Sequence, residues 1–378
     1  MGMLPLGRLL SLLFLFPVTA VGGLAERFID PVDGNFDTSD WLASRQGFLP
    51  VPIVITEPAV GYGGGIALTF FHGRFGGTAN NRRRVPPSVS VVAAGGTGNG
   101  TWFVGGGHLG IWKQDRIRYL GGAGYGNINM DYYGTGGQLA GHPVSFSSKA
   151  FGLLQQLDFR LGDSDFFSGI GYRLVDTRNR FHLSSLLPIP GVPDPDFDLR
   201  SASLSLSLGY DDRDNLFTPS RGLDAGIELS RYDTVLGGDS DFNKYRLYGK
   251  YYRPLGRDWV VGVRGDVEGV SGDDIPFYEY PFVQMRGIKV LRYQGERIAL
   301  GELELRWSFR PRWVLVGFGG VARTWFSGKS GQNGLIDSRG LGFRYLIARK
   351  LGLQAGVDIA KGPEDTAFYI VVGSSWLR

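Results

Sequence analysis

The 378-residue chain contains 60 glycines and no cysteine, and 13% of its residues are aromatic. This aromatic content excludes a disordered chain, and the lack of cysteine excludes disulfides, a thiolate nucleophile and any metal site built on sulfur. The 40 basic and 36 acidic residues are nearly balanced, so the net charge of +4 gives no support for nucleic acid as a partner.

Residues 1–25 have the pattern of a secretory signal peptide. Arg8 supplies a positive charge, residues 9–16 form a short apolar core, and Ala20 and Ala25 each end a cleavage-type sequence of small residues. The apolar run is far shorter than the ~20 residues that a membrane-spanning helix needs, and no later segment reaches that length. We therefore predict an exported chain in which residues 26–48 form a short periplasmic segment and any membrane crossing uses strands.

The hydrophobic pattern of the remaining chain has a period of two. Leu204, Leu206 and Leu208 alternate with serines, and Leu303 and Leu305 alternate with glutamates. Alternation predicts strands with one apolar and one polar face, because a helix needs apolar residues three and four apart.

Sixteen strands are expected, and most are long enough to cross hydrocarbon when they are tilted. Their predicted ranges are 49–57, 61–72, 87–96, 101–112, 116–128, 148–161, 166–177, 199–211, 222–234, 242–253, 258–270, 297–309, 312–325, 337–347, 351–360 and 367–376. Short turns alternate with long loops, as they do in outer-membrane barrels. The predicted fold of residues 49–378 is therefore all-β, a 16-stranded antiparallel transmembrane β-barrel.

A soluble β-sandwich has the same alternation, so the direction of the apolar face decides between the two folds. In a membrane barrel the apolar side chains meet lipid and the polar ones line the lumen. The even number of long strands, the signal peptide and the aromatic residues near strand ends favour the barrel. These aromatic residues are Tyr210, Trp259, Trp307 and Trp376. Sixteen strands are expected to enclose an aqueous lumen, since about eight already fill with side chains.

Few residues in this chain could carry chemistry. The histidines at 72, 108, 142 and 182 have no metal-ligand spacing, so no metal site is predicted, and no motif indicates a cofactor. The acidic string Asp211–Asp214 has neither a base nor a nucleophile beside it, and a turn is the simpler interpretation. We expect no catalytic residues, and an outer-membrane hydrolase is the least favoured alternative.

Two strings in the second half of the chain resemble a known family. The first is Met285, Arg286 and Gly287, in the long loop between the eleventh and twelfth predicted strands. The second is the turn motif formed by Asp211, Arg213, Asp214, Pro219 and Gly222, before the ninth strand. Together they resemble the barrel domain of the bacterial surface antigen family, the superfamily of the BamA and TamA assembly proteins and the two-partner secretion transporters. The resemblance covers nearly the whole predicted mature chain.

The resemblance implies a place for the arginine. In the family an Arg-Gly dipeptide tips a long loop that folds back into the lumen, so Arg286 and Gly287 are expected there. A buried arginine needs a carboxylate partner, and Glu302 and Glu304 share the polar face of the next strand. We therefore predict that Arg286 pairs with Glu302 or Glu304. The family's Phe-x-Asp-x-Gly motif has its nearest match at 318–322, where the aspartate is missing.

The resemblance also implies a function. Family translocases carry periplasmic POTRA domains before the barrel, and residues 26–48 are too few for such a domain. We expect a monomeric, non-enzymatic barrel in contact with outer-membrane lipid that helps to assemble outer-membrane proteins or to translocate polypeptide or lipid. Its first and last strands would form a seam, and a separate periplasmic partner would deliver polypeptide substrates. The alternative is a passive outer-membrane diffusion channel plugged by its own loop.

Overall fold

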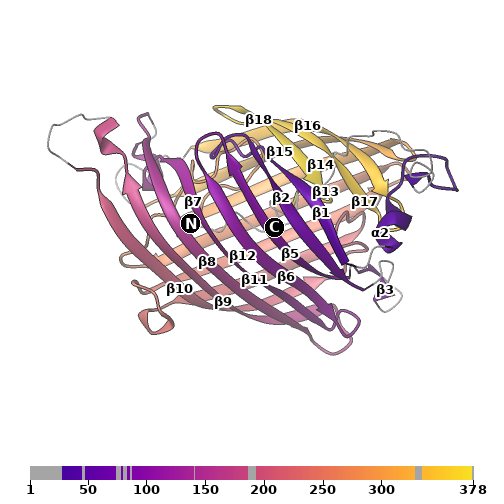
Figure 1. Cartoon of the computed structure of the whole chain (residues 1–378), viewed down its shortest axis with the longest axis horizontal. Coiled ribbons are helices and arrows are strands. Elements are labelled where there is room, and N and C mark those ends of the chain that lie inside the picture. The colour runs from indigo at the N-terminus through magenta and orange to yellow at the C-terminus, as the bar shows by residue number, and fades with distance from the viewer. Residues whose placement is uncertain are drawn as a thin grey trace.

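The computed structural model describes residues 28–44, 47–73, 78–79, 83–85, 87–139, 141–185, 193–327 and 334–376. In this part of the chain, sixteen strands form one antiparallel sheet in chain order, and the sheet curves into a tilted barrel (Figure 1). The predicted signal peptide, residues 1–25, lies outside the described residues. None of the helices in the described ranges is long and apolar enough to cross a membrane.

The sixteen predicted strands are all present, with small shifts at their ends. They are β1 (Gly47–Ile55), β2 (Gly63–His72), β5 (Ser88–Thr97), β6 (Trp102–Trp112), β7 (Ile117–Tyr132), β8 (Val144–Arg160), β9 (Phe166–Phe181), β10 (Asp196–Asp211), β11 (Gly222–Tyr232), β12 (Phe242–Leu255), β13 (Trp259–Gly272), β14 (Arg297–Arg310), β15 (Trp313–Trp325), β16 (Leu335–Ala348), β17 (Leu353–Lys361) and β18 (Thr366–Val372). Shorter elements are α2 (Ser39–Ser44), the hairpin of β3 (Thr78–Ala79) and β4 (Arg83–Arg84), and the 3-10 turns η2 (Thr135–Gly137), η3 (Leu183–Ser185) and η4 (Thr234–Leu236).

The apolar face of the sheet points outward. Leu206 and Leu303 are 61% and 54% exposed, whereas Glu302, Glu304 and Asp358 on the opposite face are almost fully buried. A soluble sandwich would bury the leucines and expose the carboxylates. The arrangement is that of a membrane barrel, with hydrocarbon outside and a polar interior.

The two rims of the barrel differ in the length of their connections. The turn between β14 and β15 has only residues 311–312, and it lies at the same rim as the start of β1. The opposite rim carries longer loops, above all residues 273–296 between β13 and β14. Since short turns face the periplasm in outer-membrane barrels, the rim at the start of β1 is the periplasmic one.

The end of the chain corrects two predictions. β18 ends at Val372, not at residue 376, and the chain then turns into the barrel. Trp376 is 2% exposed and packs on Tyr252 of β12, with ring centroids 5.8 Å apart, so it does not lie at the lipid boundary. The polar Gly373, Ser374 and Ser375 interrupt the alternation, which explains why the strand ends there.

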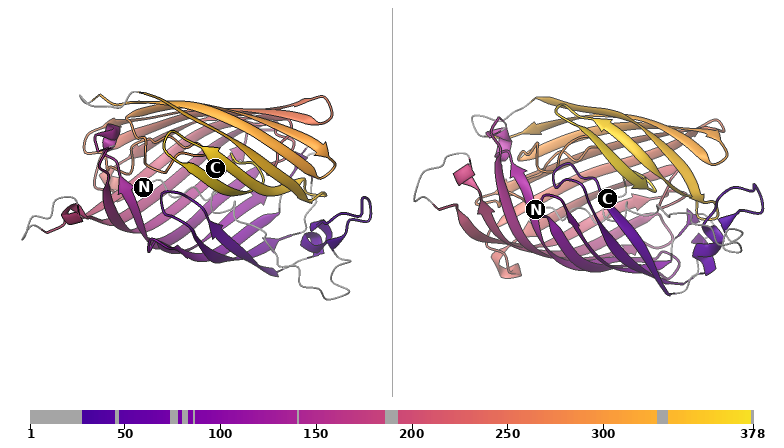
Figure 2. Two further views of the ribbon diagram at one scale, coloured as in Figure 1. Left: turned by 90° about the horizontal axis from the view of Figure 1, so that it is seen from above. Right: turned by 45° about the horizontal axis from the view of Figure 1, so that its top comes forward.

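In the part of the chain that the structure describes, the sheet does not close into a continuous ring of hydrogen bonds. β1 pairs with β2 and β18 pairs with β17, and no ladder joins β1 to β18 among the described residues. The indigo first strands and the yellow last strands lie on the same side of the barrel in both views of Figure 2. The first and last strands are therefore the two edges of the sheet, and the seam between them lacks ladder pairing in the described ranges.

Candidate functional site: the loop tip at Arg286

The long loop 273–296 folds back on itself as an irregular hairpin. The Val283 amide donates to the Tyr293 carbonyl at 2.9 Å, and the Gly295 amide donates to the Pro281 carbonyl at 3.0 Å. These bonds hold the two arms together, so that residues 284–292 form a tip.

Apolar side chains of the loop pack against two sides of the barrel interior. Val283, Met285 and Ile288 are buried against the inward-facing Leu300, Ala322 and Ile336 of β14, β15 and β16. Phe282 and Leu291 are buried against Met130 of β7, Phe146 of β8 and Val60 in the β1–β2 connection. β7 and β8 are the fifth and sixth strands of the sheet, and β14 to β16 are the twelfth to fourteenth. One loop therefore contacts opposite walls and also the strands beside the seam.

Arg286 lies at the centre of the tip and is 4% exposed. Its guanidinium forms ion pairs with Glu304 of β14 at 2.8 Å and with Asp358 of β17 at 2.9 Å. The contact with Asp358 is also a well-aligned hydrogen bond, whereas the contact with Glu304 has the distance of an ion pair without that alignment. The guanidinium further donates to Ser375 Oγ at 3.1 Å and stacks on the ring of Phe318 in β15, 3.4 Å from its centroid.

Gly287 brings the backbone of the tip close to the last two strands. Its φ is +84°, and a Cβ atom there would lie 2.9 Å from the backbone nitrogen of Gly362. Its amide donates to the hydroxyl of Tyr369 in β18 at 2.9 Å. A side chain at Gly287 would be strained by the backbone conformation and would also push the tip away from the wall.

A second buried network surrounds the tip. Arg264 of β13 pairs with Glu302 at 2.6 Å and with Asp266 at 3.1 Å, and it donates to the Gln284 carbonyl of the loop. Of the two glutamates predicted as partners of Arg286, Glu304 forms the ion pair with Arg286, and Glu302 pairs with Arg264 instead.

The turn motif forms a structured connection between β10 and β11 at the periplasmic rim. Arg213 pairs with Asp211 at 2.9 Å and with Asp224 at 3.3 Å. Asp214 accepts hydrogen bonds from the backbone amides of residues 220 and 221. Gly222 has a φ of +109°, and a Cβ atom there would meet the backbone of Arg213 at 2.7 Å.

The turn motif and the loop tip are joined through β14. Arg306 binds Glu304 through Nε at 2.8 Å and donates from Nη1 to the Pro219 carbonyl at 2.8 Å. Glu304 in turn pairs with Arg286. The two strings that are far apart in the sequence therefore belong to one buried chain of contacts.

The C-terminal segment completes this interior assembly. The Ser374 amide donates to the Phe217 carbonyl of the turn at 2.6 Å. Ser375 Oγ accepts from both Arg286 and Arg344, and Arg344 of β16 pairs with Asp358 at 2.7 Å. The loop tip, the β10–β11 turn and the residues after β18 thus share partners.

The N-terminal segment docks at the same rim. Arg312 in the β14–β15 turn binds three carboxylates, those of Asp30, Asp33 and Asp37, at 2.6–2.7 Å. Asp30 also pairs with Arg349, whose hydrogen bond holds the pKa of Asp30 well below its usual range. The hydrogen bond from Arg312 likewise lowers the pKa of Asp33. Because residue 47 begins β1, this segment links β1 to the turns beside β15 to β17.

Sequence patterns could not find several of these residues. Asp358, Arg344, Tyr369 and Ser375 carry the contacts with the tip, but each stands in an ordinary alternating strand or in the C-terminal segment. Phe318 was expected within an incomplete family motif, and it contacts Arg286 while Asp358 of β17 supplies the carboxylate.

Two histidines meet on the outer face although their spacing does not indicate it. His72 and His108 both contact Ser90 Oγ, at 2.7 and 2.8 Å. Within the described ranges, no group of three or more histidine or acidic side chains is placed to hold a metal ion.

Comparison with known proteins relates this arrangement to a family. The Omp85 superfamily domain matches residues 163–283, from the β8–β9 turn into the loop that carries the tip. This part of the chain is therefore similar to an Omp85 superfamily domain. No curated protein matches the chain.

Solved structures share the fold of this barrel at low sequence identity. The crystal structure of BamA from Haemophilus ducreyi lacking POTRA domains 1-3 has a TM-score of 0.60 and 14% identity, with 87% of this chain and 70% of that chain covered. CdiB from Escherichia coli has a TM-score of 0.59 and 10% identity, covering 85% of this chain. CdiB from Acinetobacter baumannii has a TM-score of 0.52 and 10% identity, covering 86%. The chain spans 62% and 59% of these two CdiB chains, and the likeness concerns the fold alone.

Proposed function

We propose that this barrel helps to insert or translocate polypeptide at the outer membrane, and that the seam between β1 and β18 is where the substrate engages. The observation that carries the proposal is the unpaired edge that each of these strands presents among the described residues. An unpaired edge offers a row of backbone donors and acceptors to which an incoming strand can add.

The contacts of the loop tip support the same role. Its anchors lie on β14 to β18, on one side of the seam, while Leu291 packs on Val60 next to β1, on the other side. A loop that holds both sides from within would set how easily the two edges separate. A separate periplasmic partner would deliver the polypeptide, and the proposal assigns no catalytic step to the barrel.

The chain contains no cysteine, which allows a direct test by disulfide locking. Cysteine pairs are scanned along β1 (Ile53, Val54) and β18 (Phe368, Tyr369) until one pair forms a disulfide across the seam. The matched control is Ile359→Cys with Phe368→Cys, because these residues are register partners within the β17–β18 ladder. Each variant replaces the wild-type chain in a strain whose own copy can be switched off.

Depletion of the wild-type chain is expected to lower the amount of other folded outer-membrane proteins. The seam-locked variant should fail to restore them until a reductant is added, while the control variant restores them throughout. Full rescue by the locked variant would overturn the role of the seam. Unchanged outer-membrane proteins after depletion, together with a steady solute conductance of the purified barrel in planar bilayers, would favour the plugged diffusion channel instead.

A further inference from the structure

Two basic side chains lie directly opposite each other on the outward face of the barrel, toward the long-loop rim. Arg339 of β16 and Lys361, the last residue of β17, are register partners, and both are exposed. Such partners have Cβ atoms about 4.5–5.5 Å apart, and like charges in this position destabilise a sheet. A charge on the lipid face of a barrel carries a further cost. An anion bound between the two side chains would offset both costs.

The chain itself supplies no such anion in the residues that the structure describes. Neither Arg339 nor Lys361 forms an ion pair with a carboxylate there. Asp337 stands two residues before Arg339 on the same face of β16, and within the same described ranges it pairs with neither of them. The two cations are therefore open to an anion from outside the protein.

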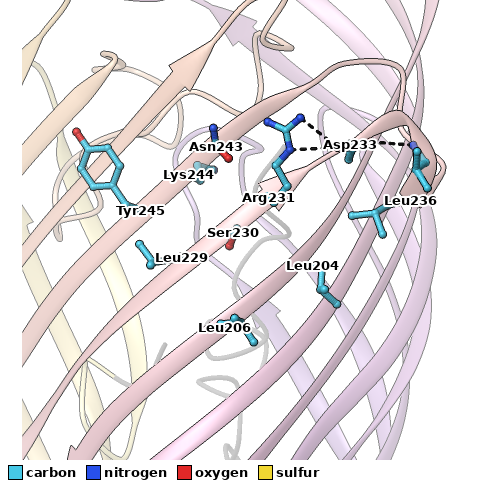
Figure 3. A pocket seen from close by; sticks show the side chains of 11 residues that line it. Leu204, Leu206, Leu229, Ser230, Arg231, Asp233, Leu236, Asn243, Lys244 and Tyr245 are labelled. Atoms are coloured by element: carbon cyan, nitrogen blue, oxygen red, sulfur yellow. Dashed lines mark hydrogen bonds and ion pairs between the residues drawn. The ribbon is translucent and has the colours of Figure 1, made fainter.

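Exposed arginines on β9 and β11 have partners within the chain. Arg178 of β9 pairs with Asp196 at 3.0 Å. Arg231 of β11, at the edge of an apolar pocket, pairs with Asp233 at 3.0 Å (Figure 3). The position of Arg339 beside Lys361 differs from these two because two positive charges meet there without a carboxylate between them.

An apolar row lies directly below the two cations, on their periplasmic side. Leu341, Ile359 and Phe368 are register neighbours across β16, β17 and β18, and they are 73%, 56% and 37% exposed. Neighbouring strands are about 4.8 Å apart, so the row is roughly 10 Å wide and can hold more than one acyl chain. Basic side chains above an apolar surface are typical of the boundary between lipid head groups and hydrocarbon.

The charge of the pair selects the kind of head group. A phosphate monoester carries a charge of about −1.5 to −2 near neutral pH, which two cations match. The phosphodiester of a glycerophospholipid has a single negative charge. The arginine fork can bind two phosphate oxygens, and the lysine adds a point charge. The long-loop rim faces the outer leaflet of the outer membrane, where the lipid is a glycolipid with phosphate monoesters and several acyl chains.

We propose that Arg339 and Lys361 bind one phosphate group of a phosphorylated glycolipid of the lipid A type. The acyl chains of this lipid lie over Leu341, Ile359 and Phe368. The lipid therefore covers the wall beside the seam, because β17 pairs with the edge strand β18. The site does not depend on the proposed function.

Native mass spectrometry of the barrel, purified in a non-ionic detergent, tests the phosphate contact. Lipid A, with or without its phosphates, is added to the wild type, to Arg339→Gln and to Lys361→Gln. The wild type should prefer the phosphorylated form, and each substitution should lower retention of that form roughly fivefold. Arg231→Gln is the matched control, because it removes one exposed positive charge from a side chain that Asp233 already binds, and it should change nothing.

Three outcomes of this measurement would contradict the proposal. Equal retention of the two forms by the wild type would overturn the phosphate contact. An equal fall in Arg231→Gln would show that only the total charge of the barrel matters. Dioleoyl phosphatidylglycerol is added in a parallel sample, and retention of it as strong as that of lipid A would overturn the assignment to a phosphate monoester.

The urea midpoint of unfolding gives a second measurement, in which the expected effect changes sign. Without lipid, Arg339→Gln and Lys361→Gln should raise the midpoint, because each removes the repulsion between two neighbouring cations. Lipid A should raise the midpoint of the wild type more than that of either variant. A lowered midpoint of both variants without lipid would show that the chain itself provides a partner for the cations, and the site would then be excluded.

Discussion

Arg286 at the tip of loop 273–296 binds Asp358 on β17 at 2.9 Å, across 72 positions of sequence. Both residues are nearly inaccessible to solvent, and Asp358 is shared with Arg344 of β16. A buried carboxylate that loses one of two cationic partners is costly, because little water is available to replace it. The pair therefore couples the conformation of the loop to the strands next to the seam.

Arg286→Ala should destabilise the barrel. The substitution leaves Glu304 with Arg306 and Asp358 with Arg344 alone, and removal of one partner of a buried pair costs about 3–5 kcal/mol. The urea midpoint of unfolding in detergent micelles is the measurement. The urea midpoint of Arg286→Lys should lie between those of the wild type and Arg286→Ala. Lysine keeps the positive charge, but it loses the planar guanidinium with its paired donors and the stacking on Phe318. Arg323→Ala, an exposed arginine, serves as the control, and an unchanged midpoint in Arg286→Ala would show that the docked tip contributes nothing to stability.

Gly287→Ala should weaken the docking of the tip more than backbone strain alone explains. Gly287 has a φ of +84° and would place its Cβ 2.9 Å from Gly362, whereas Gly256 has a φ of +73° with nothing within 4 Å. Strain at a positive φ costs about 1–3 kcal/mol in either place. The difference between the losses of unfolding free energy in Gly287→Ala and Gly256→Ala therefore measures the cost of the close contact between residue 287 and the end of β17. Equal losses in the two variants would mean that the backbone at the end of β17 moves to accommodate the added methyl group.

Most of the barrel could be predicted from the sequence because one physical rule applies along every strand. Alternating residues such as Leu204 and Leu206 must share a face, and sixteen such segments with long and short connections fit one architecture. The prediction failed at the C-terminus, where Trp376 follows an interrupted alternation and turns inward to Tyr252. A period of two gives the face of a residue only while the strand continues.

The partners within the interior could be predicted only in part. The alternation places Glu302 and Glu304 on one face, but their separation of two residues cannot tell which of them an incoming arginine reaches. That choice depends on the register of β13, which brings Arg264 opposite Glu302 and leaves Glu304 for the loop. The contact of Arg286 with Asp358 depends on how the curved sheet brings β17 beside the loop tip, which no local sequence pattern encodes.

Arg286 and Arg306 should be energetically coupled through Glu304. Each arginine forms an ion pair with this carboxylate, so the second substitution acts on a glutamate that has already lost one partner. A double-mutant cycle with Arg286→Ala and Arg306→Ala should give an interaction energy of about 0.5–3 kcal/mol, the range found for residues in one network. The same cycle between Arg286 and Arg312, which bind different carboxylates, is the control. Additive effects in the first cycle would show that the loop tip and the β10–β11 turn act separately.

The N-terminal segment should stay docked to the periplasmic rim until the pH falls below about 4. Hydrogen bonds from Arg349 and Arg312 lower the pKa values of Asp30 and Asp33 from the ordinary value of 3.8. A carboxyl group with a lowered pKa in the folded state stabilises that state above its ordinary pKa, and the contribution disappears as the pH falls through the lowered value.

A nitroxide label at Val32→Cys measures this docking, because Val32 is 73% exposed and the chain has no other cysteine. Its electron paramagnetic resonance spectrum should report an immobilised segment from pH 7 to pH 4 and a mobile one in stronger acid. Arg312→Ala should make the label mobile already at pH 7, because the three aspartates then lose their shared partner. A label that remains immobilised in Arg312→Ala at pH 7 would show that Thr38 and the apolar contacts of Trp41 hold the segment without the ion pairs.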